Sequence, residues 1–247
     1  MNTLIKLEIT RTLRNKRFMF FSVAYPAILY TVIAGGASTE ELVKGTHLTL
    51  PLLMMVSMAS FGAITAVLVG NSERIAKERE KGWVRQLRLT ALPGRGYVTA
   101  KVASAAVVSL PSIVVVFIVA AAVKNVRFDG VWQWFALTGV IWAGSIVFAA
   151  LGVAIGYLVT GDAVRPVTFI VYFVLSILGG LWMPTATFPH WVQKIAEWVP
   201  THAYAALGQA IEQGHAPHVK DVALMVAYGA LFAGAAAWLY RKDTHKS

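Results

Sequence analysis

The residues that could carry out catalysis form no recognisable set in this sequence. The six histidines fall in predicted loops, at the ends of apolar runs or in the tail, so Ser145, inside an apolar run, has no base positioned to activate it. His215 and His218 lie three residues apart, but two imidazoles without further ligands favour a polar loop over a metal site. We therefore expect no catalytic residue and no metal site in this chain.

Patterns for binding phosphate or for binding ions inside a membrane are also absent. ATP hydrolysis commonly uses a loop of the form G-x-x-x-x-G-K-[ST], and the dipeptide Gly-Lys occurs nowhere. All twelve Asp and Glu residues lie outside the centres of the long apolar runs, where an ion-driven carrier usually holds ionisable groups. We expect the chain not to hydrolyse ATP by itself, and an ion-gradient-driven secondary transporter is the weaker alternative.

Six long runs without Asp, Glu, Lys or Arg supply the elements that would position any functional residue. They cover residues 18–39, 47–72, 102–123, 130–161, 166–193 and 222–240. The chain is 57% hydrophobic and 14% charged, and a membrane-spanning helix needs about 20 apolar residues. The sequence therefore predicts an all-α integral membrane protein with six transmembrane helices in a single domain, 1–247. Without cysteine, it has neither a disulfide framework nor a thiolate metal site.

The basic residues are distributed unevenly over the two sides of this layout. Of the 22 Lys and Arg residues, 17 lie before the first run, between the second and third, between the fourth and fifth, or after the sixth. The positive-inside rule then predicts that both termini and segment 72–101 are cytoplasmic in a cell membrane, which we expect to be bacterial. The net charge of +10 is accordingly interpreted as a topology signal and not as a sign of nucleic-acid binding.

The arm before the first run, residues 1–17, has an apolar stripe. Ile5, Ile9 and Leu13 recur every four residues, which places them on one face of a helix. We expect an amphipathic helix at the inner membrane interface, and the alternative is a basic flank that only sets orientation. The first apolar run begins only after this basic arm and lacks a small-residue cleavage site after a short core, so we expect it to be retained.

Segment 72–101 is charged and lies between two apolar runs, so it is expected to meet a partner in water. The pairs Glu73 with Lys77 and Arg74 with Glu78 favour a helix over residues 73–89. Further along this helix, one apolar face is flanked by arginines, as in surfaces that a groove of a soluble partner holds. The residues of that face and its flanks are Trp83, Val84, Leu87, Arg85 and Arg88. The alternative is an amphipathic helix lying against lipid headgroups.

Two further patterns concern the helices. Met54, Met58 and Phe61 in the second run favour either a surface that adapts to apolar ligands or simple gap filling. Gly152 and Gly156 allow close approach of another helix, from this chain or from a second subunit.

Segment 184–218 is punctuated by prolines and rich in aromatic residues. Trp191, Ile195 and Trp198 fall at i, i+4 and i+7, on one face of a short helix. We expect short helices that lie on or re-enter the outer leaflet, with Pro184, Pro189 and Trp191 as marker residues. The alternative is an aromatic belt that anchors the neighbouring spans.

Two stretches resemble the membrane subunits of type-2 ATP-binding cassette exporters. The first has the acid Glu80, then Gly82, a short helix, the run Thr90-Ala91-Leu92-Pro93, and Lys101 at the start of the next span. The second is the stretch Gly179-Gly180-Leu181-Trp182-Met183-Pro184 followed by Phe188-Pro189-His190-Trp191. Trp83 and Arg85 depart from the Thr and Glu that are commoner in the family.

The resemblance implies a permease half that is itself not an enzyme. It would work with a second copy or a paralogue, and with two copies of a separate ABC ATPase that holds ATP and Mg. The cargo would be a hydrophobic or amphipathic compound, such as a drug, antibiotic or lipid, moved outward as in multidrug or antibiotic efflux. A non-transporting sensor or immunity subunit is a further alternative.

The same resemblance suggests roles for individual residues. ATPase coupling is expected from Glu80, Gly82, Trp83, Val84, Arg85, Leu87 and Arg88. Spans two and five would line the route, with cargo contacts at Met54, Met58, Phe61, Phe169, Tyr172 and Phe173.

Overall fold

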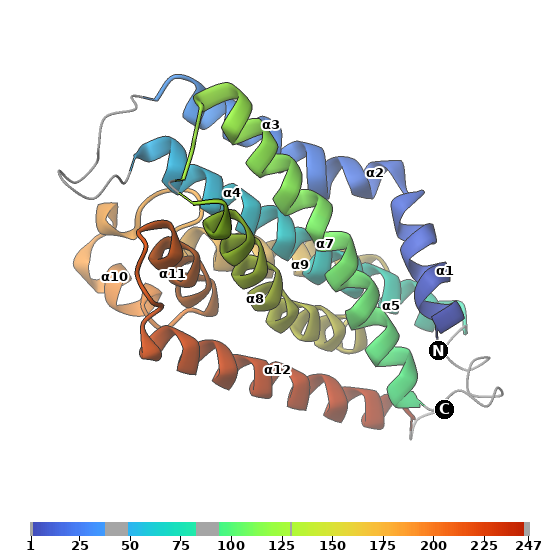
Figure 1. Cartoon of the computed structure of the whole chain (residues 1–247). Coiled ribbons are helices and arrows are strands. Elements are labelled where there is room, and N and C mark those ends of the chain that lie inside the picture. Colours follow the sequence, from blue (N-terminus) through green and yellow to red (C-terminus); the bar gives the residue numbers. More distant parts are fainter. Residues whose placement is uncertain (1, 38–48, 83–93, 129, 245–247) are drawn as a thin grey trace.

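The computed structural model describes residues 2–37, 49–82, 94–128 and 130–244, and the regular elements in these ranges are helices (Figure 1). In chain order they are α1 (Asn2–Leu13), α2 (Lys16–Met19), α3 (Tyr25–Gly35), α4 (Leu50–Ile64), α5 (Gly70–Glu80), α7 (Gly94–Lys124), α8 (Val131–Leu158), α9 (Val164–Leu178), α10 (His190–Ala196), α11 (Pro200–Glu212) and α12 (Val219–Thr244). Short 3-10 turns at Gly161–Ala163 and Thr185–Thr187 precede α9 and α10.

Six helices are long and apolar enough to cross a membrane, which confirms the predicted fold class. They are Lys16–Gly35, Leu50–Glu80, Tyr97–Lys124, Val131–Leu158, Gly161–Leu178 and Val219–Asp243. The first two spans each contain a π-helical stretch, at Phe20–Ala24 and Thr65–Val69, where the helix takes one wider turn.

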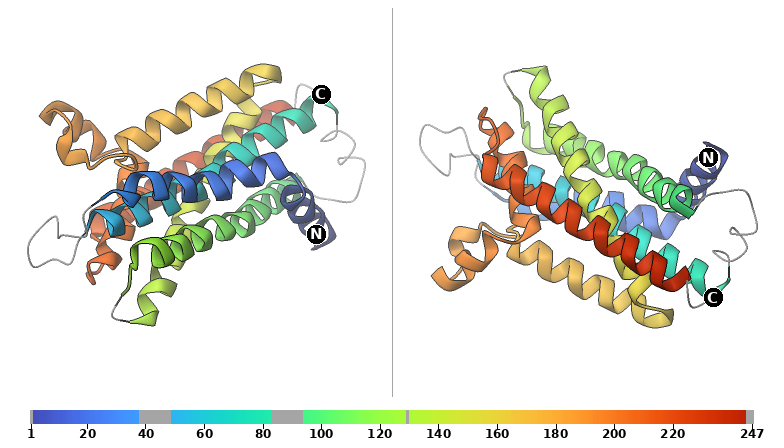
Figure 2. Two further views of the ribbon diagram at one scale, coloured as in Figure 1. Left: turned by 90° about the horizontal axis from the view of Figure 1, so that it is seen from above. Right: turned by 90° about the horizontal axis from the view of Figure 1, so that it is seen from below.

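The second span is the centre of the bundle. Within its most apolar window, 94% of the residues are buried, compared with 11% in the sixth span. Helices α3, α7, α8, α9 and α11 all contact α4, α5 or the π-helical stretch between them. In α4, every residue from Pro51 to Ile64 is buried. Figure 2 shows the other long helices arranged around this one.

Two glycines bring α8 against the second span. A Cβ atom on Gly152 would lie 2.6 Å from the carbonyl oxygen of Leu68, and one on Gly156 would lie 3.0 Å from the carbonyl oxygen of Ser72. Any side chain here would collide with backbone, so the glycines permit the close packing that their spacing predicts. Their partner is a helix of this same chain.

The fifth span ends in a sharp turn. Helix α9 stops at Leu178, and Gly180 has φ 78°, a conformation that residues with a Cβ rarely adopt. A Cβ on Gly179 would lie 2.3 Å from Oγ1 of Thr201, so α11 can approach this turn only because Gly179 has no side chain. The turn sends the chain back toward the bundle.

Segment 184–218 contains the short helices that the sequence predicts. Helix α10 exposes Trp191 and Ile195, and Trp198 directly after it is also exposed. Helix α11 is instead packed into the bundle, where the hydroxyl of Tyr204 donates to the backbone carbonyl of Ile141 at 2.7 Å. The position of these helices relative to a bilayer stays a prediction.

The bundle has two distinct ends. Both termini lie at one end, which we call the termini end, and α10 and α11 lie at the other, which we call the α10–α11 end (Figure 1).

The start of segment 72–101 differs from the expected water-exposed helix. Helix α5 continues the second span and ends at Glu80, and Gly82 has φ 68°, so the helix predicted over 73–89 is interrupted. Ser72, Ile75, Ala76 and Glu78 are buried. The one charged residue among them, Glu78, can be buried because it finds oppositely charged partners on other helices.

Candidate functional site

A lysine with two carboxylate partners is buried at the termini end. The Nζ atom of Lys101, on α7, lies 2.8 Å from Oε1 of Glu8 on α1 and 2.7 Å from Oε1 of Glu78 on α5. The exposed fractions of these side chains are 1% for Lys101, 6% for Glu8 and 5% for Glu78. One ammonium group therefore joins three helices, of which α1 is far from the other two in the sequence.

Three more side chains complete this group. Tyr97 donates its hydroxyl to Oε2 of Glu78 at 2.6 Å, and Nη1 of Arg11 lies 3.3 Å from Oε1 of Glu78. Arg74 donates to Oγ1 of Thr12, and its Nη1 lies 3.6 Å from Oε2 of Glu8, a charge contact too long for a hydrogen bond. We call the set the Lys101 cluster; its members are Glu8, Arg11, Arg74, Glu78, Tyr97 and Lys101.

Because the Lys101 cluster is buried, it should hold its three helices together. A charge removed from water is tolerated only when it is paired, and loss of one partner from a buried pair costs about 3–5 kcal/mol. Separating α1, α5 and α7 would leave at least one carboxylate or ammonium group unpaired. The three helices are therefore expected to move together at this end.

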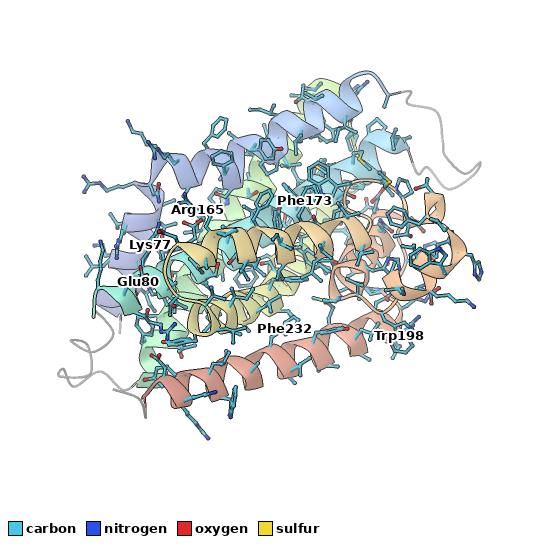
Figure 3. All side chains as sticks on the ribbon, turned by 180° about the vertical axis from the view of Figure 1, so that it is seen from behind. Lys77, Glu80, Arg165, Phe173, Trp198 and Phe232 are labelled. Carbon is cyan, nitrogen blue, oxygen red and sulfur yellow. The ribbon has the colours of Figure 1, made fainter. Side chains whose placement is uncertain are left out.

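Further ion pairs and a hydrogen bond extend from α5 to α8, α9 and α12. Arg79 lies 2.5 Å from Asp243 on α12 and donates to the carbonyl oxygen of Gly156 on α8 at 3.0 Å. Glu73 lies 3.1 Å from Arg165, at the start of α9, and 3.3 Å from Lys77. Figure 3 shows Lys77, Glu80 and Arg165 near one another at the termini end.

The pair Glu73 with Lys77 confirms one sequence prediction, whereas the pairing expected of Arg74 with Glu78 is replaced. Arg74 lies against Glu8, and Glu78 lies against Lys101. Sequence reasoning did not place Glu8 at a site at all. The sequence nevertheless contains a feature that could have pointed to Glu8, because it is the one acidic residue among the first seventeen residues of an otherwise basic arm.

Only part of the expected ATPase-coupling set is described. Glu80 is exposed at the end of α5, and Gly82 follows it in a turn. The remaining members lie outside the described residues, and their role stays a prediction: Trp83, Val84, Arg85, Leu87 and Arg88. Helices α5 and α7, which the Lys101 cluster joins, are the elements directly before and after them.

The aromatic residues expected along a cargo route contact one another where spans two and five meet. Ring centroids are 4.9 Å apart for Phe61 and Tyr172, 5.1 Å for Phe61 and Trp182, and 5.6 Å for Phe173 and Trp182. Phe169 stacks on Phe173 at 5.8 Å, and both rings are on the exposed side of α9. Figure 3 labels Phe173 on this face. Trp182 was not among the expected route residues.

The two methionines belong to the same buried core as Phe61 and Tyr172, whereas Phe169 and Phe173 are exposed. Met54 and Met58 are completely buried in the core around α4. The hydroxyl of Tyr172 donates to the carbonyl oxygen of Phe61 at 3.1 Å and lies 2.5 Å from Oγ1 of Thr65. The contact between spans two and five is therefore polar near Tyr172 and aromatic beside it.

The marker residues of segment 184–218 occupy helix starts. Pro184 precedes the turn Thr185–Thr187, and Pro189 caps α10, whose Trp191 is 68% exposed. The segment is tied to α12 by ion pairing of Lys220 with Glu197 at 3.2 Å and by donation from Tyr228 to the carbonyl oxygen of Trp198 at 2.7 Å. Figure 3 shows Trp198 beside the start of α12.

One acidic residue at the α10–α11 end is buried without compensation. Neither carboxylate oxygen of Glu212, the last residue of α11, has a hydrogen-bond partner in the part of the chain that the structure describes. Burial raises the pKa of Glu212 to about 8, and burial lowers the pKa of His202 on the same helix. Both groups are therefore held mainly in their neutral forms at neutral pH.

In the part of the chain that the structure describes, potential metal ligands are not grouped. Within residues 2–37, 49–82, 94–128 and 130–244, no three histidine or acidic side chains are placed to share a metal ion.

Comparison with known proteins gives two matches. A family model described as "ABC-2 family transporter protein" matches residues 24–239. A protein of Bacillus subtilis (strain 168), named "Putative transport permease YvfS", is 27% identical over 239 residues, which cover 96% of this chain and 95% of that protein. Both matches include the helices that carry the Lys101 cluster on α5 and α7.

Proposed function

Since this chain belongs to the ABC-2 family of transporter proteins, we propose that it is the membrane subunit of an ATP-driven exporter, energised by a separate ATPase. Its six apolar helices and its family make it a multi-pass transmembrane transporter subunit. The ATPase partner is in general implied by the family. ATP and Mg would be held by that partner.

The Lys101 cluster is the observation that carries the proposal. An ATPase docked on residues 83–93 would push on the end of α5 and the start of α7. Lys101 and Glu78 pair across these two helices at 2.7 Å, and Glu8 adds the N-terminal arm. A displacement at the docking site would then be passed to three helices as one unit, as in rigid-body switching.

The family and the charge distribution support a proposal for the assembly. We propose two permease halves, identical or paralogous, with two ATPase copies bound on the cytoplasmic side, where both termini would lie. Spans two and five would line a route for a hydrophobic or amphipathic compound moved outward. The aromatic group around Phe61, Tyr172 and Trp182, where these spans meet, supports an apolar cargo.

A matched pair of double variants tests the docking site. W83A/L87A removes the apolar face expected to hold the ATPase, and W191A/I195A removes an exposed apolar face of the same kind at the α10–α11 end. We expect W83A/L87A to abolish co-purification of the ATPase from native membranes and W191A/I195A to leave it unchanged. Full retention of the ATPase by W83A/L87A would contradict the docking assignment.

An ion-driven carrier is the second candidate because Glu212 is a buried acid without a partner among the described residues, as proton carriers often contain. Vesicles that contain the purified chain and no ATPase distinguish the two. An exporter subunit moves an amphipathic dye only when the ATPase and ATP are added. Gradient-driven movement by the chain alone, lost in E212Q, would favour the carrier, and ATPase binding without flux would favour a sensor or immunity subunit.

A further inference from the structure

An apolar groove of about 580 Å³ runs between α7, α8 and α12. None of its lining residues is on α9 or belongs to the aromatic group described above. The groove exists because the facing side chains are too short to fill the space. They include Ala143 and Ala150 on α8, and Gly229, Ala233 and Ala237 on α12. Its volume is within the range of about 300–1,000 Å³ that is typical of ligand pockets.

The length of the groove matches one leaflet of a bilayer. Its wall on α12 runs from Gly229, near the middle of the span, to Arg241, at the termini end. At about 1.5 Å per residue, these positions are roughly 18 Å apart. Half of a hydrocarbon core of about 30 Å is roughly 15 Å. The groove therefore covers the depth of one acyl chain and does not continue into the other leaflet.

The polar groups of the groove are at its termini end. Its lining is apolar except for Thr99, Tyr240 and Arg241, which lie at the start of α7 and near the end of α12. Arg241 is exposed and forms no ion pair with any described residue, whereas the nearby Asp243 is paired with Arg79 at 2.5 Å. An apolar groove with a guanidinium at its mouth that no described residue neutralises complements a molecule with one long apolar tail and an anionic head.

We propose that this groove binds a phospholipid with an anionic headgroup from the leaflet at the termini end. One acyl chain lies along Ala233 and Ala237, and the headgroup phosphate accepts hydrogen bonds from Arg241. The occupant is a lipid because the groove opens from membrane-spanning helices at the depth of the hydrocarbon. The inference requires only that the chain spans a membrane, and it is independent of the ATPase and of the cargo.

The test measures lipid binding to the purified full chain by native mass spectrometry, with phosphatidylglycerol and phosphatidylcholine as probes. R241Q removes the charge at the mouth, and K242Q removes a neighbouring charge that lies over Trp238 and does not line the groove. A233L fills the groove, and G234L adds the same side chain where open space surrounds the position. Thermal unfolding of each lipid-free variant checks that it is folded.

We expect the unaltered chain to retain phosphatidylglycerol. R241Q should bind this lipid about fivefold more weakly than the unaltered chain, since one basic residue contributes about 1 kcal/mol to binding of anionic lipid. K242Q and G234L keep the affinity of the unaltered chain within about twofold. A233L loses both lipids. Equal loss in R241Q and K242Q would show a diffuse surface charge instead of a site, and unchanged lipid binding by A233L would exclude the groove. A change of oligomeric state in A233L without loss of lipid would assign the groove to a second copy of the chain.

Discussion

The two ends of the bundle bury acidic side chains in opposite ways. At the termini end, Glu8 and Glu78 share the ammonium group of Lys101 at 2.8 and 2.7 Å. At the α10–α11 end, Glu212 is buried to a similar degree without a hydrogen bond from any described residue. The comparison shows that burial alone does not decide what a carboxylate does. Its partners decide whether it holds helices together as an anion or remains a protonated, neutral group.

The largest expected effect comes from breaking the Lys101 cluster. K101M leaves the carboxylates of Glu8 and Glu78 buried without their shared cation, which should lower the free energy of unfolding by about 3–5 kcal/mol. Thermal unfolding of the purified chain measures the loss. A fall in the unfolding midpoint no larger than that of a substitution at the exposed Lys77 would show that the cluster does not join the helices.

The second effect concerns Glu212 and depends on pH. Its pKa rises from 4.5 to about 8 on folding, so the folded state binds the proton more tightly than the unfolded state. The resulting stabilisation is complete below pH 4.5 and is lost as pH rises toward 8, by about 3 kcal/mol between pH 4.5 and pH 7. E212Q lacks this dependence, so its unfolding midpoint relative to the unaltered chain should rise with pH.

Midpoints measured at pH 5 and pH 8 for both proteins check this expectation. The difference between the two proteins cancels the contribution of His202, which has the opposite sign because its pKa is lowered. If the difference is the same at both pH values, Glu212 is ionised or paired in the folded chain, and the contrast between the two ends is wrong.

A smaller effect is expected within the Lys101 cluster. Y97F removes the hydroxyl that donates to Oε2 of Glu78 at 2.6 Å, and a hydrogen bond to a charged group contributes about 2 kcal/mol. Lys101 still pairs with Glu78, so the helices stay joined. Co-purification of the ATPase should be retained while the unfolding midpoint falls. Loss of the ATPase in Y97F would mean that the cluster also fixes the docking surface itself.

The smallest effect is expected where an ion pair faces water. Lys220 and Glu197, at the α10–α11 end, are 52% and 54% exposed at a separation of 3.2 Å. K220M should change the free energy of unfolding by less than about 1 kcal/mol, because solvent already screens both charges. A loss comparable with that of K101M would show that ion pairs stabilise both ends equally.

The sequence predicted the helices better than it predicted their contacts. Runs free of charge identified all six spans, since the apolar length needed to cross a membrane is a local property. The glycines Gly152 and Gly156 predicted a close helix contact, but not which helix provides it. The Lys101 cluster could not be predicted, because its carboxylates come from positions 8 and 78 and meet only after the arm folds against α7.

The environments of Glu212 and of the expected cargo-route residues also depend on contacts that the sequence does not reveal. In the sequence, Glu212 is one of twelve acidic residues outside the apolar runs, and only the return of α11 into the bundle buries it. Met54 and Met58 are of the residue type that favours an adaptable ligand surface, yet within this chain they fill the core around α4. Their contact with cargo stays a prediction that depends on rearrangement or on the second half.

The central place of the second span has a consequence for how the protein is made. Synthesis delivers Leu50–Ile64 before α7, α8, α9 and α11, the helices that later surround it. For that interval α3 is the only one of its partner helices already made, so most of the surface of the segment must face lipid, with Ser57 and Ser60 as its hydroxyl side chains. Its nearly unbroken apolar surface makes this exposure to lipid favourable. The residues that pack the finished core must therefore also be apolar enough for insertion into the bilayer.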